Sequence, residues 1–130
     1  MRFESRTWFS GALGHDMELL VYGHAGQALI CFPSQDGRAG DWAGFGMVDA
    51  VADLIEAGRL LVVAVDGVDW QGWTNSDLPV GDRARRQEVY QSYIVDDVVP
   101  FARTETGRDS VWLAGCSMGA YHAEIGRAHV

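Results

Sequence analysis

The chain has 130 residues, 48% of them hydrophobic, and carries 18 acidic against 10 basic side chains, for a formal net charge of −8. This length suits one domain, and the apolar content supports a packed core and excludes a disordered chain. The acidic balance argues against a nucleic-acid-binding protein, which usually presents a basic surface. The start of the chain lacks the apolar core of a signal peptide, and no apolar run reaches the roughly 18 residues of a membrane span. The sequence therefore predicts a cytoplasmic protein. Cys31 and Cys116 each adjoin an apolar run, so we expect both to be free thiols.

The pattern in the first quarter of the chain predicts that the sheet begins with antiparallel strands. Residues 6–33 contain three extended runs, which glycine-containing turns separate at 11–16 and 23–27. The third run, at 28–32, is wholly apolar, as expected of a strand that is covered on both faces. We expect the next segment, 33–46, to be a loop.

Helices and strands alternate over the rest of the chain. This alternation predicts a mostly parallel sheet with helices on both faces. Pro100 cannot continue a helix without the loss of a hydrogen bond, so we expect it to kink the helix or to begin a new turn. In chain order we expect a helix at 47–58, a buried strand at 59–67, a loop at 68–81, a helix from Asp82 to Val99, a third buried strand at 110–115 and a helix that begins at Met118.

The most informative motif is GCSMG at 115–119, which follows the apolar run VWLA and precedes an expected helix. A G-x-S-x-G pattern between a strand and a helix is typical of a serine nucleophile on a sharp turn. Both glycines would let neighbouring backbone approach closely, and the helix N-terminus would point its positive dipole end at the reacting centre. We favour Ser117 as a nucleophile over the alternative of a glycine-rich turn with an incidental serine.

An acyl-transfer enzyme also needs two N–H donors for the oxyanion. One should come from the residue after the nucleophile, here Met118, and the other from the loop after an earlier strand. The loop PSQDG at 33–37 follows the strand at 28–32. We therefore expect the backbone N–H of Gln35 to be the second donor, with Ser34 as the next candidate.

The histidines of the chain are poorly placed to activate Ser117. His122 lies on the helix that begins at Met118, and that helix should run away from the site. His24 is expected at the opposite end of the sheet, and His15 about three strands from the nucleophile, on the order of 15 Å away. His129 lies at the chain end.

Two aspartates and two tryptophans follow the second buried strand. Trp70 and Trp73 are candidates for a substrate wall, because large amphipathic rings suit an apolar acyl or aryl group, although packing of the loop onto the sheet is the alternative. Asp66 and Asp69 are expected to stabilise turns rather than to contact substrate. Neither metal-ligand spacing nor a phosphate loop nor a dinucleotide fingerprint occurs, so no metal and no cofactor is expected.

Four stretches of the chain together resemble one known family. They are GHDMELLVYGH, ALICFPSQDGRAGDWAGFGMVDAV, VDGVDWQGWTNSD and LAGCSMGAYHA. They are similar to esterases of the α/β-hydrolase superfamily, in the branch of esterase D and the mycolyltransferases, and the resemblance covers about residues 5–123. It implies half of an α/β-hydrolase fold, with an antiparallel start, a mostly parallel sheet and helices on both faces.

The same resemblance implies a function. Ser117 would be the nucleophile and the Met118 N–H would lie in the oxyanion hole, while the acid and the histidine of the triad would follow the serine turn at positions that this chain does not contain. The implied activity is hydrolysis of a small-molecule carboxylic ester through an acyl-enzyme on Ser117, and we expect the chain as given to be inactive or nearly so. An acyltransferase of the same fold and a non-catalytic binding module are the alternatives.

The last seven residues, 124–130, interrupt the pattern. The helix after the serine turn is expected to lie beneath the sheet and to continue with small and apolar residues, but Glu124 and Arg127 are charged. We therefore expect 124–130 to be a non-native tail, and 1–130 to be a single partial α/β-hydrolase domain of a protein that continued past Ala123. The strand before Ser117 would then be an exposed sheet edge, which is an aggregation hazard.

Overall fold

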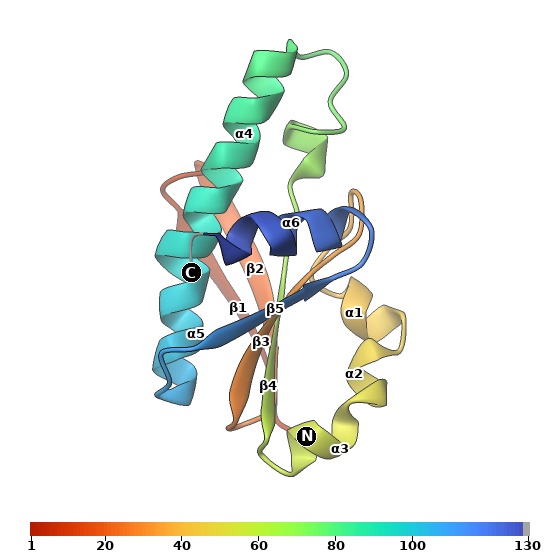
Figure 1. Ribbon diagram of the computed structural model, residues 1–130, viewed down its shortest axis with the longest axis vertical. Helices are drawn as coiled ribbons and strands as arrows, with labels where there is room; N and C mark the ends of the chain where they lie inside the picture. The colour runs from red at the N-terminus through yellow and green to blue at the C-terminus, as the bar shows by residue number, and fades with distance from the viewer. Residues whose placement is uncertain (129–130) are drawn as a thin grey trace.

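The computed structural model, which describes residues 1–128, is built around one five-stranded sheet (Figure 1). Its strands are β1 (Phe3–Ser10), β2 (His15–Tyr22), β3 (Gln27–Phe32), β4 (Leu60–Val65) and β5 (Val111–Gly115). They lie in the order β1-β2-β4-β3-β5. β2 pairs antiparallel with β1 and β4, whereas β3 pairs parallel with β4 and β5. The expected antiparallel start followed by parallel strands is confirmed.

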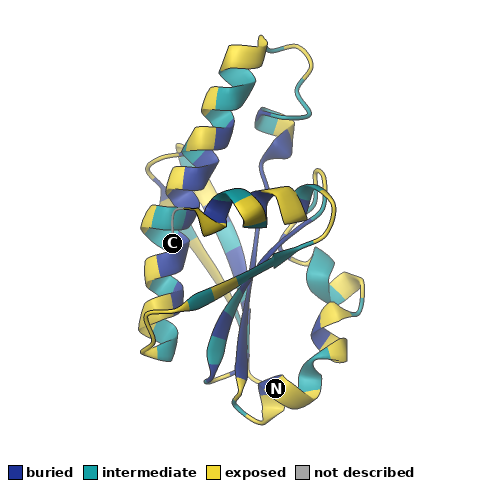
Figure 2. Ribbon diagram, viewed as in Figure 1, coloured by how far each residue is buried: buried dark blue, intermediate teal, exposed yellow. Residues whose placement is uncertain are grey.

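The central strand of the sheet is fully buried. β4 has the sequence LLVVAV and is buried at every position, as Figure 2 shows. β2 and β3 flank it, and helices cover both faces of the sheet. β-branched side chains fit this doubly covered surface, so β4 reads as a continuous apolar run rather than as an alternating one.

Helices pack on both faces of the sheet (Figure 1). They are α1 (Asp41–Gly44), α2 (Met47–Ala50), α3 (Ala52–Glu56), the 3₁₀-helix η1 (Asp69–Gln71), α4 (Val80–Tyr93), the π-helix η2 (Ile94–Val98), α5 (Val99–Thr106) and α6 (Met118–Arg127). On one face, Val48 and Ile55 pack with Val62 of β4. On the other face, Tyr93 packs with Val63. In the part of the chain that the structure describes, no helix is long and apolar enough to cross a membrane.

The segment after β3 differs from the sequence-based expectation. The single helix expected at 47–58 is split at Val51, where φ is −113° and ψ is 13°, into α2 and α3. The expected loop at 33–46 contains α1, and Gly46, with φ of 80°, separates α1 from α2. Gly58, with φ of 68°, follows α3 near the expected end of this helical region.

A long helical segment runs from α4 through η2 to α5. The π-helical turn η2 lies directly before Pro100, which occupies the start of α5. Pro100 has no N–H to donate to the carbonyl of Asp96, and its ring would crowd that oxygen, so the backbone widens there. The new turn that was one of the two expected outcomes at Pro100 is present, and Tyr93, Val98 and Val99 are buried.

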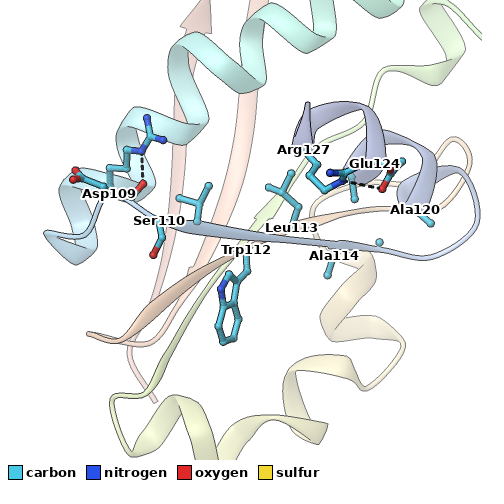
Figure 3. Close-up of a pocket in the computed structure, with 12 residues that line it drawn as sticks. Asp109, Ser110, Trp112, Leu113, Ala114, Ala120, Glu124 and Arg127 are labelled. Atoms are coloured by element: carbon cyan, nitrogen blue, oxygen red, sulfur yellow. Dashed lines mark hydrogen bonds and ion pairs between the residues drawn. The ribbon is translucent and has the colours of Figure 1, made fainter. Parts of the chain in front are cut away.

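β5 forms one edge of the sheet. Figure 3 shows the groove beside this strand, with Trp112 and Leu113 on opposite faces and Leu113 on the side of α6. The Trp112 side chain is 58% exposed. An uncovered strand edge presents backbone N–H and C=O groups that can pair with another chain, and the aggregation hazard expected at this strand stays a prediction.

α6 carries the first residues of the expected tail. Glu124 and Arg127 are exposed and form an ion pair, with 2.6 Å between Arg127 Nη2 and Glu124 Oε1. The expectation that these positions are buried is wrong, because this side of α6 borders the open groove beside β5 (Figure 3). The non-native origin of 124–130 stays a prediction, and residues 129–130, which include His129, lie outside the described residues.

Candidate active site

Ser117 lies in the turn between the end of β5 and the start of α6. Its φ is 57° and its ψ is −122°. Among residues 1–128, only Asp36 and Ser117 combine a side chain with a positive φ, and Asp36 lies in the loop after β3. A backbone in such a sparsely populated region costs about 1–3 kcal/mol and persists only where the surroundings impose it. The strand–turn–helix geometry predicted for Ser117 is therefore present.

The two glycines of the motif have no room for a side chain. A Cβ at Gly119 would lie 2.5 Å from the carbonyl oxygen of Pro33 and 2.6 Å from that of Phe32. A Cβ at Gly115 would collide with the backbone carbonyl of Gly119. These close approaches bring the start of the β3–α1 loop directly against the turn that carries Ser117.

The same loop contains the expected second oxyanion donor. Within the described residues, the backbone N–H groups of Met118, Ser34 and Gln35 donate to no other residue. The N–H of Asp36 is engaged, because it donates to Asp69 Oδ2 at 3.1 Å. Met118 begins α6, so its free N–H also lies at the positive end of that helix. The assignment of Met118 and Gln35 as the donor pair stays a prediction, with Ser34 as the other free donor of the loop.

His122 is fully engaged away from Ser117. The side chain is 1% exposed, and its Nε2 lies 2.8 Å from Asp69 Oδ1. Its Nδ1 lies 3.2 Å from Gln87 Nε2. Because both ring nitrogens already have partners, neither is free to accept the proton of Ser117.

The other two described histidines lie elsewhere. His15 is on β2, three strands from β5 in the sheet order, with its Nδ1 3.0 Å from the carbonyl oxygen of Asp16 and its Nε2 2.7 Å from Gln71 Nε2. His24 lies against Gly58, just before β4, and so at the opposite end of the parallel strands from Ser117. In residues 1–128, no group of three His, Cys, Asp or Glu side chains could hold a metal ion.

Asp66 has the structural role that the sequence favoured. Its buried carboxylate accepts two hydrogen bonds from Arg38, at 3.1 and 3.2 Å, and one from the N–H of Ala39 at 2.9 Å. The hydrogen bond to Asp66 and its negative charge raise the pKa of Arg38. Asp66 thus ties the β3–α1 loop to the end of β4.

The two tryptophans of the loop after β4 have different surroundings. Trp73 donates from Nε1 to Gln87 Oε1 at 2.8 Å and meets the Tyr121 ring edge-on at 5.9 Å between centroids. Trp70 is exposed. Trp73 therefore packs onto α4 and α6, and a part for either ring in substrate binding stays a prediction.

An apolar pocket that the sequence did not predict lies beside the Ser117 turn. It has a volume of about 490 Å³, and its wall includes Ser34 of the β3–α1 loop and Cys116. Trp42, Phe45 and Met47 of the α1–α2 segment form its apolar side. The signal in the sequence was two aromatic residues late in the expected loop and a methionine at the start of the expected helix, and the sequence interpretation did not connect them.

The two thiols are expected to differ sharply in reactivity. Cys31 is buried, and burial raises the pKa of its thiol well above the usual range, whereas Cys116 is exposed. Since the thiolate is the reactive form, iodoacetamide at neutral pH should modify Cys116 in the folded chain and Cys31 only after denaturation. Peptide mass mapping checks this, with Cys116→Ser as the control. Rapid modification of Cys31 in the folded chain would contradict the described core.

No protein-family model and no curated protein matches this chain. Solved structures do match it. A ferulic acid esterase superimposes with a TM-score of 0.71 at 20% identity, over 98% of this chain and 55% of its own. MPT51 from Mycobacterium tuberculosis superimposes with a TM-score of 0.70 at 17% identity, over 99% of this chain and 47% of its own. An S-formylglutathione hydrolase from Agrobacterium tumefaciens superimposes with a TM-score of 0.66 at 18% identity, over 93% of this chain and 50% of its own.

These matches define the class of fold: the chain has an α/β-hydrolase fold and spans about half the length of the solved structures that it matches. Within that class, the matching structures belong to the esterase D and mycolyltransferase-like branch that the sequence motifs resemble. At 20% identity or less the likeness concerns the fold. The chemistry of the site rests on its own residues.

Proposed function

We propose that this chain is the nucleophile-bearing part of a serine esterase, in which Ser117 attacks a carboxylic ester. The observation that carries the proposal is the backbone of Ser117, held at φ 57° between β5 and α6. Such a turn exposes a serine hydroxyl at the end of a strand and beside a helix N-terminus, as acyl-transfer chemistry requires. Two of the matching structures are named as an esterase and a hydrolase, which supports the proposal.

In the proposed reaction, Ser117 Oγ forms a bond to the carbonyl carbon and loses its proton to a base. The negative charge that develops on the carbonyl oxygen is stabilised by the N–H groups of Met118 and Gln35. The alcohol leaves with a proton, and water then attacks the acyl-enzyme to release the acid and restore Ser117. An alcohol in place of water would give an acyltransferase on the same site. The base, a histidine oriented by an acid, is not supplied by His15, His24 or His122.

The pocket beside the turn suits the apolar part of the substrate. Its wall is predominantly apolar and includes the exposed Phe45 and Met47 and the half-buried Trp42, and Ser34 connects it to the proposed oxyanion loop. Burial of apolar surface in such a pocket would favour an ester with an apolar acyl or aryl group. Trp70 and Trp73 are the second candidates for a substrate wall.

The test of this proposal supplies the base as free imidazole. With p-nitrophenyl acetate, imidazole should increase p-nitrophenol release more for the wild-type chain than for Ser117→Ala, because it can accept the proton of Ser117. Ser92→Ala, at an exposed serine of α4, is the matched control and should behave like the wild-type chain. Equal imidazole dependence in all three proteins would contradict the esterase proposal and favour a non-catalytic binding module.

A further inference from the structure

A continuous series of hydrogen bonds joins α4, α6, η1 and the β3–α1 loop behind the Ser117 turn. Trp73 Nε1 lies 2.8 Å from Gln87 Oε1, and Gln87 Nε2 lies 3.2 Å from His122 Nδ1. His122 Nε2 lies 2.8 Å from Asp69 Oδ1, and Asp69 Oδ2 accepts the N–H of Asp36 at 3.1 Å. We call these five residues the Trp73–Asp36 network. Gln87, His122 and Asp69 are all buried, so loss of one partner would leave another polar group unpaired and away from water.

The chemistry of the partners fixes the direction of every hydrogen bond in the network. An indole N–H can only donate, so the group of Gln87 that faces Trp73 is the carbonyl oxygen and the group that faces His122 is the amide NH₂. His122 Nδ1 must therefore accept, and Nε2 carries the proton that is donated to Asp69. The carboxylate of Asp69 only accepts, and its second oxygen receives the N–H of Asp36.

The network ends in the turn that presents the proposed oxyanion donor. Residues 34–37 form this turn, which the N–H of Gly37 closes on the carbonyl of Ser34 at 3.0 Å, and Asp36 within it has φ of 55°. Thr74 adds a second tie, because its Oγ1 donates to Asp36 Oδ1 at 2.6 Å and its N–H donates to the carbonyl of Asp69 at 2.9 Å. The turn is thus held to η1 through both the backbone and the side chain of Asp36.

We propose that Asp69 and His122 are positioning residues that fix the 34–37 turn relative to Ser117. His122 lies on α6, the helix that begins directly after Ser117, and Asp69 connects that helix to the N–H of Asp36. Because the N–H of Asp36 donates to Asp69, the N–H of Gln35 is the free donor at the centre of the turn. The geometric part of this proposal is independent of the reaction, and only its consequence for the oxyanion rests on the proposed esterase function.

Amide hydrogen exchange, followed by NMR on the whole chain, tests the connection. In the wild-type chain the amide of Asp36 should exchange more slowly than that of Gln35. Asp69→Asn replaces one accepting oxygen by an NH₂ group, and His122→Leu removes the donor that orients Asp69. Each variant should speed exchange at Asp36 about tenfold or more, since a hydrogen bond to a charged group is lost or weakened.

Three comparisons separate positioning from general loss of stability. His122→Gln, which keeps a donor, should retain part of the protection of Asp36, and His15→Gln, outside the network, should retain all of it. The amides of Val62 and Val63 in β4 should keep their wild-type rates. Wild-type exchange at Asp36 in His122→Leu, with faster exchange in Asp69→Asn, would overturn the role of His122, and no change in either variant would overturn the proposal.

A measurement on the wild-type chain decides the matter if the buried variants fail to fold. The ¹⁵N chemical shifts of the His122 ring at pH 7 should show a protonated Nε2 and an unprotonated Nδ1. The opposite tautomer, or a doubly protonated ring, would overturn the network. Neither exchange at Asp36 nor the tautomer of His122 depends on the reactivity of Ser117, so failure of the esterase proposal would leave both results interpretable.

Discussion

Without added imidazole, the purified chain is expected to hydrolyse p-nitrophenyl acetate no faster than its Ser117→Ala variant. Both ring nitrogens of His122 and of His15 already have partners, and His24 lies at the other end of the sheet. A serine hydroxyl without a base loses its proton poorly. An otherwise intact enzyme that lacks a triad member keeps a rate only about 10³–10⁴-fold above that in water, from the oxyanion hole and substrate binding.

Steady-state release of p-nitrophenol measures this expectation. Turnover at an ordinary enzymatic rate that disappears in Ser117→Ala would show that a base is present in the chain. His122→Gln and His15→Gln would then identify which histidine serves, and the hydrogen-bonded arrangement described for that ring would have to change during the reaction.

Gly119→Ala is expected to lower the free energy of unfolding by about 3 kcal/mol, near the upper end of the usual cost of overpacking. The added Cβ would meet the carbonyl oxygens of Pro33 and Phe32 at 2.5 and 2.6 Å, and both belong to backbone rather than to a movable side chain. The strain would also push the β3–α1 loop away from the Ser117 turn. Urea unfolding followed by tryptophan fluorescence gives the difference between the variant and the wild-type chain.

Gly44→Ala is the matched control for this substitution. Gly44 lies in α1, and a Cβ there meets nothing within 4 Å, so the change should be neutral or stabilise the chain by about 0.4–1 kcal/mol. Equal stability of Gly119→Ala and Gly44→Ala would mean that the loop and the turn are not in the close contact described here.

Sequence patterns predicted the elements whose signal is local. The wholly apolar runs of β3 and β4, the break at Pro100 and the glycines on either side of the serine each follow from one short stretch of chain. Gly115 and Gly119 illustrate this. A side chain at either position would collide with neighbouring backbone, so the G-x-S-x-G motif itself indicates where backbone segments lie close together.

The features that the sequence did not predict depend on contacts between distant residues. His122 and Asp69 are separated by 53 positions, and neither residue alone signals a buried pair. The exposure of Glu124 and Arg127 depends on what lies beside β5, which periodicity on α6 does not encode. Two missed features were local: the split of the helix at Val51 and the short helix α1 within the expected loop at 33–46.

The most direct test of the account is the identity of the residue that carries the acyl group. After incubation with p-nitrophenyl acetate and imidazole at mildly acidic pH, which slows deacylation, the chain is digested and its peptides are mapped by mass spectrometry. The account predicts an acetyl group on the peptide that contains Ser117, dependent on imidazole and absent from Ser117→Ala. No acetyl group on the Ser117 peptide, or acetylation that is equally abundant on Ser92 and Ser117, would contradict a nucleophilic role for Ser117.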